Sequence, residues 1–209
     1  MTNPNPRSAV AGIAAVACIA ALVLCACRSA PTRIYDIDPA PPAARMDTYR
    51  SPPLRIDTVH VPPGWDRIEI LTPTAGGGLR IDDFDRWPAP LTQVIRQVLS
   101  ADLDARLPSG AVVYPHLPKS AGALGIDVDI LEFAVVSSQS SMSASWVITP
   151  AAGPQAARRN VATLHNPVSS TDAAAVARAW SELIGQLADR IAADAASFED
   201  PSIPAGGSP

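Results

Sequence analysis

Residues 80–107, RIDDFDRWPAPLTQVIRQVLSADLDARL, join two different patterns of apolar residues. From Leu91 onward, apolar side chains recur at intervals of three and four residues, which predicts an amphipathic helix with one buried face. Before this helix, Leu79 and Ile81 end a strand that follows a glycine-rich turn. The predicted buried face consists of Leu91, Val94, Ile95, Val98, Leu99 and Leu103, and the helix ends at Pro108, Ser109 and Gly110.

Three carboxylates, those of Asp82, Asp83 and Asp85, fall between this strand and this helix. We interpret them as negative charges placed just before the helix, where they would complement the positive end of its dipole. Pro88 and Pro90 fit at or near the first turn, which tolerates proline best. The acids lack the spacing and the glycine of an EF-hand loop, so we predict no calcium site here.

Aromatic and basic side chains lie among these acids. We expect Phe84 and Trp87 to anchor the junction by packing, and Arg86 to pair with a nearby acid or to cap a carbonyl group. The junction is therefore a candidate structural motif or interface rather than a catalytic site.

The flanking sequence predicts further strands and one more helix. Val176, Trp180, Leu183, Ile184, Leu187 and Ile191 form a continuous apolar stripe, preceded by the N-cap residues Ser170, Thr171 and Asp172. Two helices would bury both stripes by covering one face of a sheet, so we predict one α+β domain with a mainly antiparallel or mixed sheet of about five to seven strands. The strand-like segments are RIYDID (33–38), LRIDTVHV (54–61), RIEIL (67–71), AVVYP (111–115), GIDVDILEF (125–133), SMSASWVIT (141–149) and RRNVATLHNPV (158–168).

The first 27 residues have the organisation of a bacterial lipoprotein signal peptide. Arg7 precedes an apolar run that is shorter than the roughly 20 residues of a spanning helix. The run ends in LCAC, and we predict that Cys27 receives the lipid. Cys25 fits less well because Leu24 would occupy the cleavage position, and Cys18 follows too short an apolar run. An uncleaved anchor helix is the alternative.

Export and lipidation set the expected location of the domain. All three cysteines lie at or before Cys27, so the mature domain would contain no disulfide and would depend on burial for stability. Arg28 and Ser29 follow, without the aspartate that retains lipoproteins in the inner membrane, which favours the inner leaflet of the outer membrane. The chain has a net charge of −4, which gives no electrostatic basis for nucleic-acid binding.

We expect four segments along the chain. These are a signal peptide (1–26), a lipidated N-terminus with a Pro/Ala-rich tether and a first short strand (27–53), the rest of the domain (54–197) and a disordered tail (198–209). The domain itself is expected to begin near residue 33.

The sequence contains few residues arranged for catalysis or metal binding. The three histidines have no partner at metal-ligand spacing, and the Gly-x-Ser-x-Gly and Ser-x-x-Lys motifs are absent. Asp127 and Asp129 point the same way from a strand and could flank a substrate, although the solvated face of an amphipathic strand explains them better. We therefore predict no catalytic residue, no metal and no cofactor.

The stretch IDDFDRWPAPLTQVIRQVLSADLDARLP, together with motifs before and after it, resembles the ABC-type transport auxiliary lipoprotein domain of PqiC/YmbA-like proteins. The resemblance covers nearly the whole mature chain, with departures at Trp65, at Pro88 and in the 150–160 loop. The matching residues are Tyr35, Ile37, Val61, Pro62, Asp66, Arg67, Phe84, Asp85, Arg86, Trp87, Leu107, Pro108, Trp146 and the segment LADRIA at 187–192.

The resemblance implies a non-enzymatic accessory subunit of a lipid transport system. Such proteins sit under the outer membrane, dock onto the periplasmic end of an MCE-domain tunnel protein, support envelope integrity and can self-associate. It marks Asp66, Arg67, Phe84, Asp85, Arg86, Trp87 and Trp146 as candidate interface or structural positions. The alternatives are an envelope hydrolase that uses Asp127 and Asp129 or the 82–85 cluster, and an outer-membrane assembly or structural lipoprotein.

Overall fold

The structure is a computed structural model that describes residues 30–74, 78–136, 138–151 and 153–198. Contacts between residues divide the chain into two units, 1–32 and 33–209, and the fold below is that of the second unit. The predicted signal peptide, the predicted lipidation site Cys27 and residues 199–209 lie outside the described residues. Within the described residues, no helix is long and apolar enough to cross a membrane.

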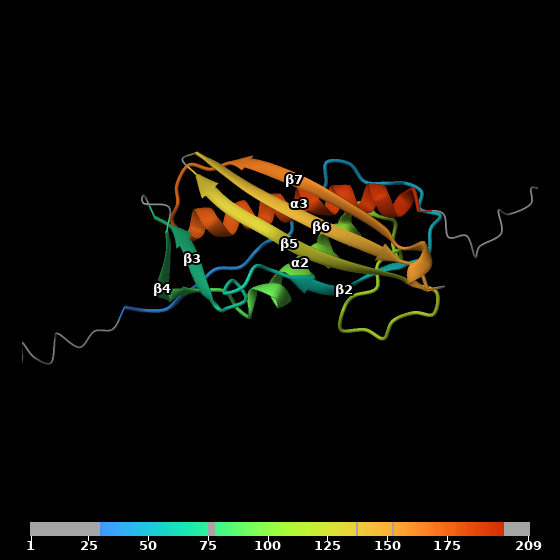
Figure 1. The fold of residues 1–209 in the computed structure, drawn as a ribbon, viewed down its shortest axis with the longest axis horizontal. Coiled ribbons are helices and arrows are strands. Elements are labelled where there is room, and N and C mark those ends of the chain that lie inside the picture. Colours follow the sequence, from blue (N-terminus) through green and yellow to red (C-terminus); the bar gives the residue numbers. More distant parts are fainter. Residues whose placement is uncertain (1–29, 75–77, 137, 152, 199–209) are drawn as a thin grey trace, which may run out of the picture. The chain divides into compact units, whose positions relative to one another are not determined.

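The predicted α+β domain is confirmed, with its strands divided between two sheets (Figure 1). The three-stranded sheet has the order β1-β4-β3, with β1 at Arg33–Ile34, β3 at Glu69–Pro73 and β4 at Leu79–Arg86. The four-stranded sheet has the order β2-β5-β6-β7, with β2 at Leu54–His60, β5 at Leu124–Val136, β6 at Gln139–Thr149 and β7 at Arg158–Pro167.

Both sheets are mixed. In the larger sheet, β2 runs parallel to β5, while β5, β6 and β7 form an antiparallel meander. In the smaller sheet, β3 and β4 form an antiparallel hairpin and β1 adds to β4 in parallel. The register between β2 and β5 shifts between Ile56 and Thr58, so the buried positions of β2 change phase from Leu54 and Ile56 to Val59.

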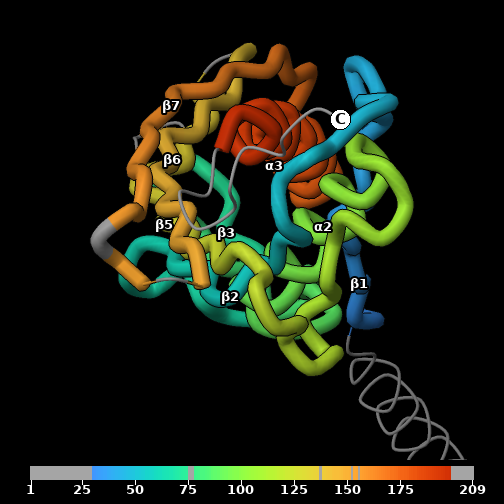
Figure 2. The backbone as a smooth tube through the Cα atoms, turned by 90° about the vertical axis from the view of Figure 1, so that its right-hand side faces the viewer, coloured from blue at the N-terminus to red at the C-terminus, as the bar shows by residue number. Residues whose placement is uncertain are grey.

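The two helices lie against the inner face of the larger sheet, which curves around α3 (Figure 2). Helix α2 spans Leu91–Arg106 and helix α3 spans Ala173–Ala196. Every residue of the two predicted apolar stripes is buried, and Asp172 caps α3 by accepting a hydrogen bond from the backbone N–H of Ala175 at 2.8 Å. A 3-10 turn, η1 (Pro154–Ala156), connects β6 to β7.

The side of the larger sheet that faces the helices supplies the rest of the core. Alternate residues of β6, namely Met142, Ala144, Trp146 and Ile148, are buried as predicted. Because the helices cover this face only, the opposite face keeps the polar residues of the alternation, among them Ser143 and Asp127.

Three local expectations were wrong. Residues 82–86 belong to β4, so the acids of this segment are part of a strand rather than a lead into a helix, and α2 has no acid in its first turn. The AVVYP segment forms only an isolated bridge between Val112 and Leu54, since too few residues pair to make a strand. Phe198, assigned to the tail, is buried against the core.

Candidate functional site

Asp85 fastens the beginning of the domain to β4. Its buried carboxylate accepts two hydrogen bonds from Arg33, from Nε at 2.6 Å and from Nη2 at 2.9 Å. Such a two-pronged pair fixes geometry as well as charge, and these contacts raise the pKa of Arg33 above its usual value. The backbone N–H of Tyr35 then donates to the carbonyl of Arg86 at 2.9 Å. The residues that would follow the lipid tether are therefore held directly on the three-stranded sheet.

Asp66 provides the negative charge at the start of α2 that we had assigned to the 82–85 acids. Its Oδ1 accepts from the backbone N–H of Thr92 at 3.1 Å and from the Thr92 hydroxyl at 2.9 Å. Pro90, at the N-cap position, makes no side-chain cap bond. A carboxylate from a distant loop therefore satisfies a free N–H group of the first turn.

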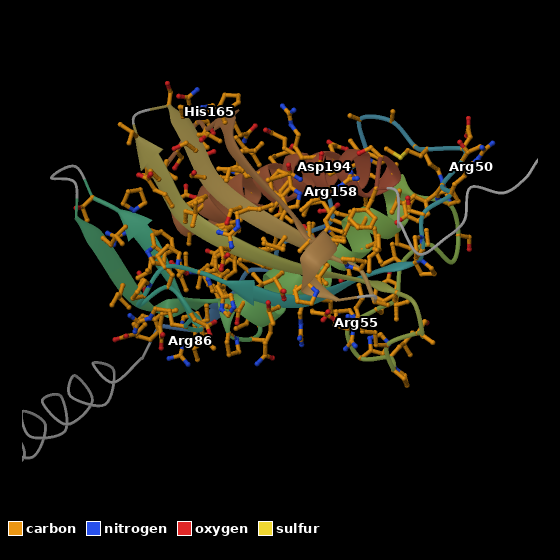
Figure 3. The ribbon with its side chains drawn as sticks, turned by 45° about the vertical axis from the view of Figure 1, so that its right-hand side comes forward. Arg50, Arg55, Arg86, Arg158, His165 and Asp194 are labelled. Carbon is orange, nitrogen blue, oxygen red and sulfur yellow. The ribbon has the colours of Figure 1, made fainter. Side chains whose placement is uncertain are left out.

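Arg67 lies just before β3, and Arg86 ends β4. Arg67 Nε donates to Glu69 Oε2 at 3.0 Å, and this bond is the main reason that the pKa of Glu69 lies below its usual value. Arg86 pairs with Glu69 in the strand register, and its Nε donates to the carbonyl of Asp83 at 2.8 Å. Arg86 is labelled in Figure 3 at the end of the domain that carries β3 and β4.

Trp87 and Trp146, the two tryptophans marked as candidate interface or structural positions, contact different parts of the core. Trp87 is only 3% exposed, and its backbone N–H donates to the carbonyl of Ile68 at 2.7 Å, so it joins β4 to the loop before β3. Trp146 on β6 donates from Nε1 to Asp194 on α3 at 3.0 Å (Asp194 is labelled in Figure 3). Phe84 is half-buried. The structure thus gathers Asp66, Arg67 and residues 84–87 around β4 and the start of α2, and places Trp146 on the other sheet.

A buried ionic cluster on α2 and α3 was not predicted from the sequence. Arg106 donates from Nη1 to Asp102 Oδ1 at 3.2 Å and from Nε to Asp189 Oδ1 at 2.6 Å. The side chains of Arg106 and Asp102 are 2% and 0% exposed. The spacing of four residues within DLDAR (102–106) could have indicated the pair, since both charges lie next to the apolar stripe of α2.

This cluster holds the N-terminal segment between the two helices. Asp102 Oδ1 accepts from the N–H of Ala40 at 2.8 Å, and Arg106 Nη1 donates to the carbonyl of Ala40 at 3.3 Å. The N–H of Met46 donates to the carbonyl of Arg106 at 2.8 Å. A Cβ atom added to Gly185 would lie 2.5 Å from Cβ of Ala40, so only glycine allows the segment to approach α3 this closely.

Burial raises the pKa of Asp102 from 3.8 to about 6, because the loss of water around its carboxylate outweighs the attraction of Arg106. Its second oxygen, Oδ2, is buried and receives no hydrogen bond, which also disfavours the charged form. Since the native state keeps this proton at a pH where the unfolded chain has lost it, the carboxyl contributes stability below pH 4, and this contribution is lost as the pH rises through about 6.

We expect Asp102→Asn to remove this pH dependence. The amide can still accept the hydrogen bond from Ala40, and it does not titrate. Between pH 4 and pH 7, the stability of the variant relative to the parent should therefore rise by up to about 3 kcal/mol. Urea unfolding of both proteins across this pH range measures the effect. Parallel stability curves for the two proteins would show that Asp102 titrates normally.

The other acids considered for chemistry are occupied by local hydrogen bonds. Asp127 accepts from the Thr58 hydroxyl on β2, and Asp129 accepts from the Ser145 hydroxyl on β6 at 3.5 Å. Among the described residues, no three His, Cys, Asp or Glu side chains gather in a way that could hold a metal ion. The hydrogen bonds around β4 and α2 fasten segments of the chain to one another.

Two solved structures have a fold similar to the one described above. A crystal structure described as that of an uncharacterized protein matches with a TM-score of 0.63 at 16% identity, over 79% of this chain and 99% of that chain. A crystal structure of a DUF330 protein from Xanthomonas campestris matches with a TM-score of 0.58 at 20% identity, over 77% and 93% of the two chains. At these identities the likeness establishes the fold alone. The search of curated proteins found no match.

The family comparison is more specific. A family model described as the ABC-type transport auxiliary lipoprotein component matches residues 35–192. The match begins at Tyr35, which is hydrogen-bonded to Arg86 of β4, and ends within α3. The match includes every predicted motif residue from Asp66 to Trp146. The chain therefore belongs to the family of ABC-type transport auxiliary lipoprotein components.

Proposed function

We propose that this protein is a non-enzymatic, lipid-anchored accessory subunit of an MCE-type intermembrane lipid transport system. It is anchored through acyl chains on Cys27 in the inner leaflet of the outer membrane. From there it docks onto the periplasmic end of an MCE-domain tunnel protein and so supports the integrity of the envelope. Self-association of several copies around such a tunnel is part of the proposal.

The observation that carries this proposal is the family match over residues 35–192, read together with how the start of the domain is held. The predicted lipid site lies six positions before Arg33, whose guanidinium is locked to the buried Asp85 at 2.6 Å. Six extended residues span at most about 20 Å, so the domain would stay close to the membrane that holds the lipid. The contacts of Ala40 with Asp102 and Arg106 continue the attachment of the N-terminal segment into the core.

The proposal predicts a stable complex with the MCE-domain protein encoded in the same cell. When both proteins are produced together at native levels, affinity purification of either one should recover the other. Failure to recover a complex under mild detergent conditions would contradict the proposed partner.

A Cys27→Ser variant tests the anchor separately from the partner. It should be lost from the outer-membrane fraction, because it can carry no acyl chain, while its purified domain still binds the MCE-domain protein. A variant that stays in the outer-membrane fraction would contradict lipidation at this residue.

A further inference from the structure

Strand β5 has an open edge at its carboxyl end. Its pairing with β2 ends where His60 lies opposite Asp129, although β5 continues to Val136. On its other side, β5 stays paired with β6 as far as Val136 and Gln139. In an antiparallel pair, alternate residues direct their N–H and C=O groups away from the partner strand. Among the described residues, no strand pairs with β5 beyond Asp129 on the β2 side, so these backbone groups lack strand partners.

A groove of about 690 Å³ runs along this open edge. One wall consists of four consecutive residues of β5, Phe133–Val136, and the opposite wall comes from the β3–β4 hairpin, including Leu71 and Leu79. Because consecutive residues of a strand point to opposite faces, a groove that touches all four follows the edge of the strand and not one of its faces. Figure 1 shows the end of β5 beside this hairpin.

The groove is uncharged and partly apolar at its surface. None of the described side chains that line it is ionisable. Val136 is 68% exposed and Leu79 is 51% exposed, while Trp65 packs its ring edge-on against Phe133 at a centroid distance of 5.6 Å. Exposed apolar side chains next to unpaired backbone groups are the features of a surface that accepts an added strand.

We propose that an extended, uncharged and apolar segment of a partner protein adds to β5 at Phe133–Val136 and fills this groove. Strand addition of this kind uses main-chain hydrogen bonds for affinity and side-chain pockets for specificity. An acyl chain could cover Leu79 and Val136, but it would leave the backbone groups of β5 without partners. A second copy could offer its edge strand β7, which begins with Arg158 and Arg159. Burying these charges in an uncharged groove is unfavourable.

The inference rests on the proposed function in one respect, the choice of the MCE-domain protein as the probe. In the full chain, we expect Val136→Lys and Leu79→Lys each to weaken the complex with that protein at least about tenfold. A lysine at position 136 opposes pairing at the open edge of β5, and a lysine at position 79 places a charge in the uncharged opposite wall of the groove. The matched control is Val161→Lys on β7, which is 63% exposed and outside the groove, and it should leave binding unchanged. All three sites are exposed, so thermal unfolding should differ little among the variants.

Photo-crosslinking identifies the occupant directly. With p-benzoylphenylalanine at position 136, we expect a crosslink to a protein segment that is uncharged and free of proline, and no such crosslink from position 161. Adducts only with phospholipid, adducts only with a second copy, or equal crosslinking from both positions would each overturn the inference.

The two proposals fail in different ways. If the MCE-domain protein binds but the lysine variants bind it as well as the parent does, the groove is not the docking site and the proposed function stands. If that protein does not bind at all, the proposed function fails. In that case, a crosslink from position 136 to an extended segment of another identified protein would support the groove as a docking site, and the lack of such a crosslink would overturn the inference.

Discussion

Arg106→Ala should lower the free energy of unfolding by about 3–5 kcal/mol at neutral pH, because it removes one member of a buried ion pair. The guanidinium is 2% exposed and contacts Asp102 on α2, Asp189 on α3 and the carbonyl of Ala40. Its removal leaves the Asp102 carboxylate in the interior without a positive partner. It also releases the hydrogen bond that holds the N-terminal segment at Ala40.

Urea unfolding of the purified domain measures this loss, and Arg96→Ala is the matched control. Arg96 lies on the same helix and makes one long hydrogen bond, from Nη1 to the carbonyl of Asp57 at 3.4 Å. Its replacement should cost less than about 1 kcal/mol, as expected for a half-exposed polar contact. We further expect the cost of Arg106→Ala to be smaller at pH 5 than at pH 7.5, because Asp102 can then remain protonated. Equal losses for the two arginine variants would show that the buried cluster does not stabilise the fold.

Sequence periodicity was sufficient to predict both helices. The apolar stripes of α2 and α3 follow the helical repeat without interruption, and every residue of both stripes is buried. Alternation was equally informative in β6, where Trp146 and its neighbours face the helices. These patterns are local, so neighbouring residues alone determine them.

Pairing between distant segments was harder to predict. The division of the strands into two sheets depends on β1 and β4, whose paired residues are 52 positions apart and are joined by the Arg33–Asp85 pair. The acids of residues 82–85 stand close to a helix in the sequence, yet β4 extends through them and the helix is capped by Asp66 instead. A carboxylate brought in by a loop satisfies the helix as well as an adjacent one does, and periodicity cannot tell the two apart.

The contacts within the candidate site were also hard to predict from the sequence, because they join distant segments. The resemblance marked Asp66, Asp85 and Trp87 as important, and the structure adds what each one contacts. The Asp102–Arg106 cluster was missed because two charges next to an apolar stripe normally lie on the solvated edge of a helix. Only the course of the Ala40 segment across Gly185 explains why these charges are buried.

Trp180→Ala should also be strongly destabilising, by about 3–5 kcal/mol, because it removes the largest fully buried side chain of the core. The Trp180 ring stacks on Phe133 at a centroid distance of 4.2 Å and an angle of 11°, and Trp65 meets it edge-on at 6.2 Å. These rings join α3 to β5 and to the loop before β3. The cavity left by alanine would lie directly beneath the groove wall at Phe133, so the same variant should weaken partner binding.

Trp180→Phe separates the packing of this ring from its polar atom. Phenylalanine keeps a ring to stack on Phe133 and removes Nε1, which is buried in the native protein without a hydrogen-bond acceptor. An unsatisfied buried donor costs about 1–3 kcal/mol, and losing it offsets part of the volume lost. We therefore expect Trp180→Phe to destabilise the domain by less than half as much as Trp180→Ala in urea unfolding. If the two variants were equally destabilised, the indole N–H would have to be making a stabilising contact, and the aromatic stacking could not be the main contribution of Trp180.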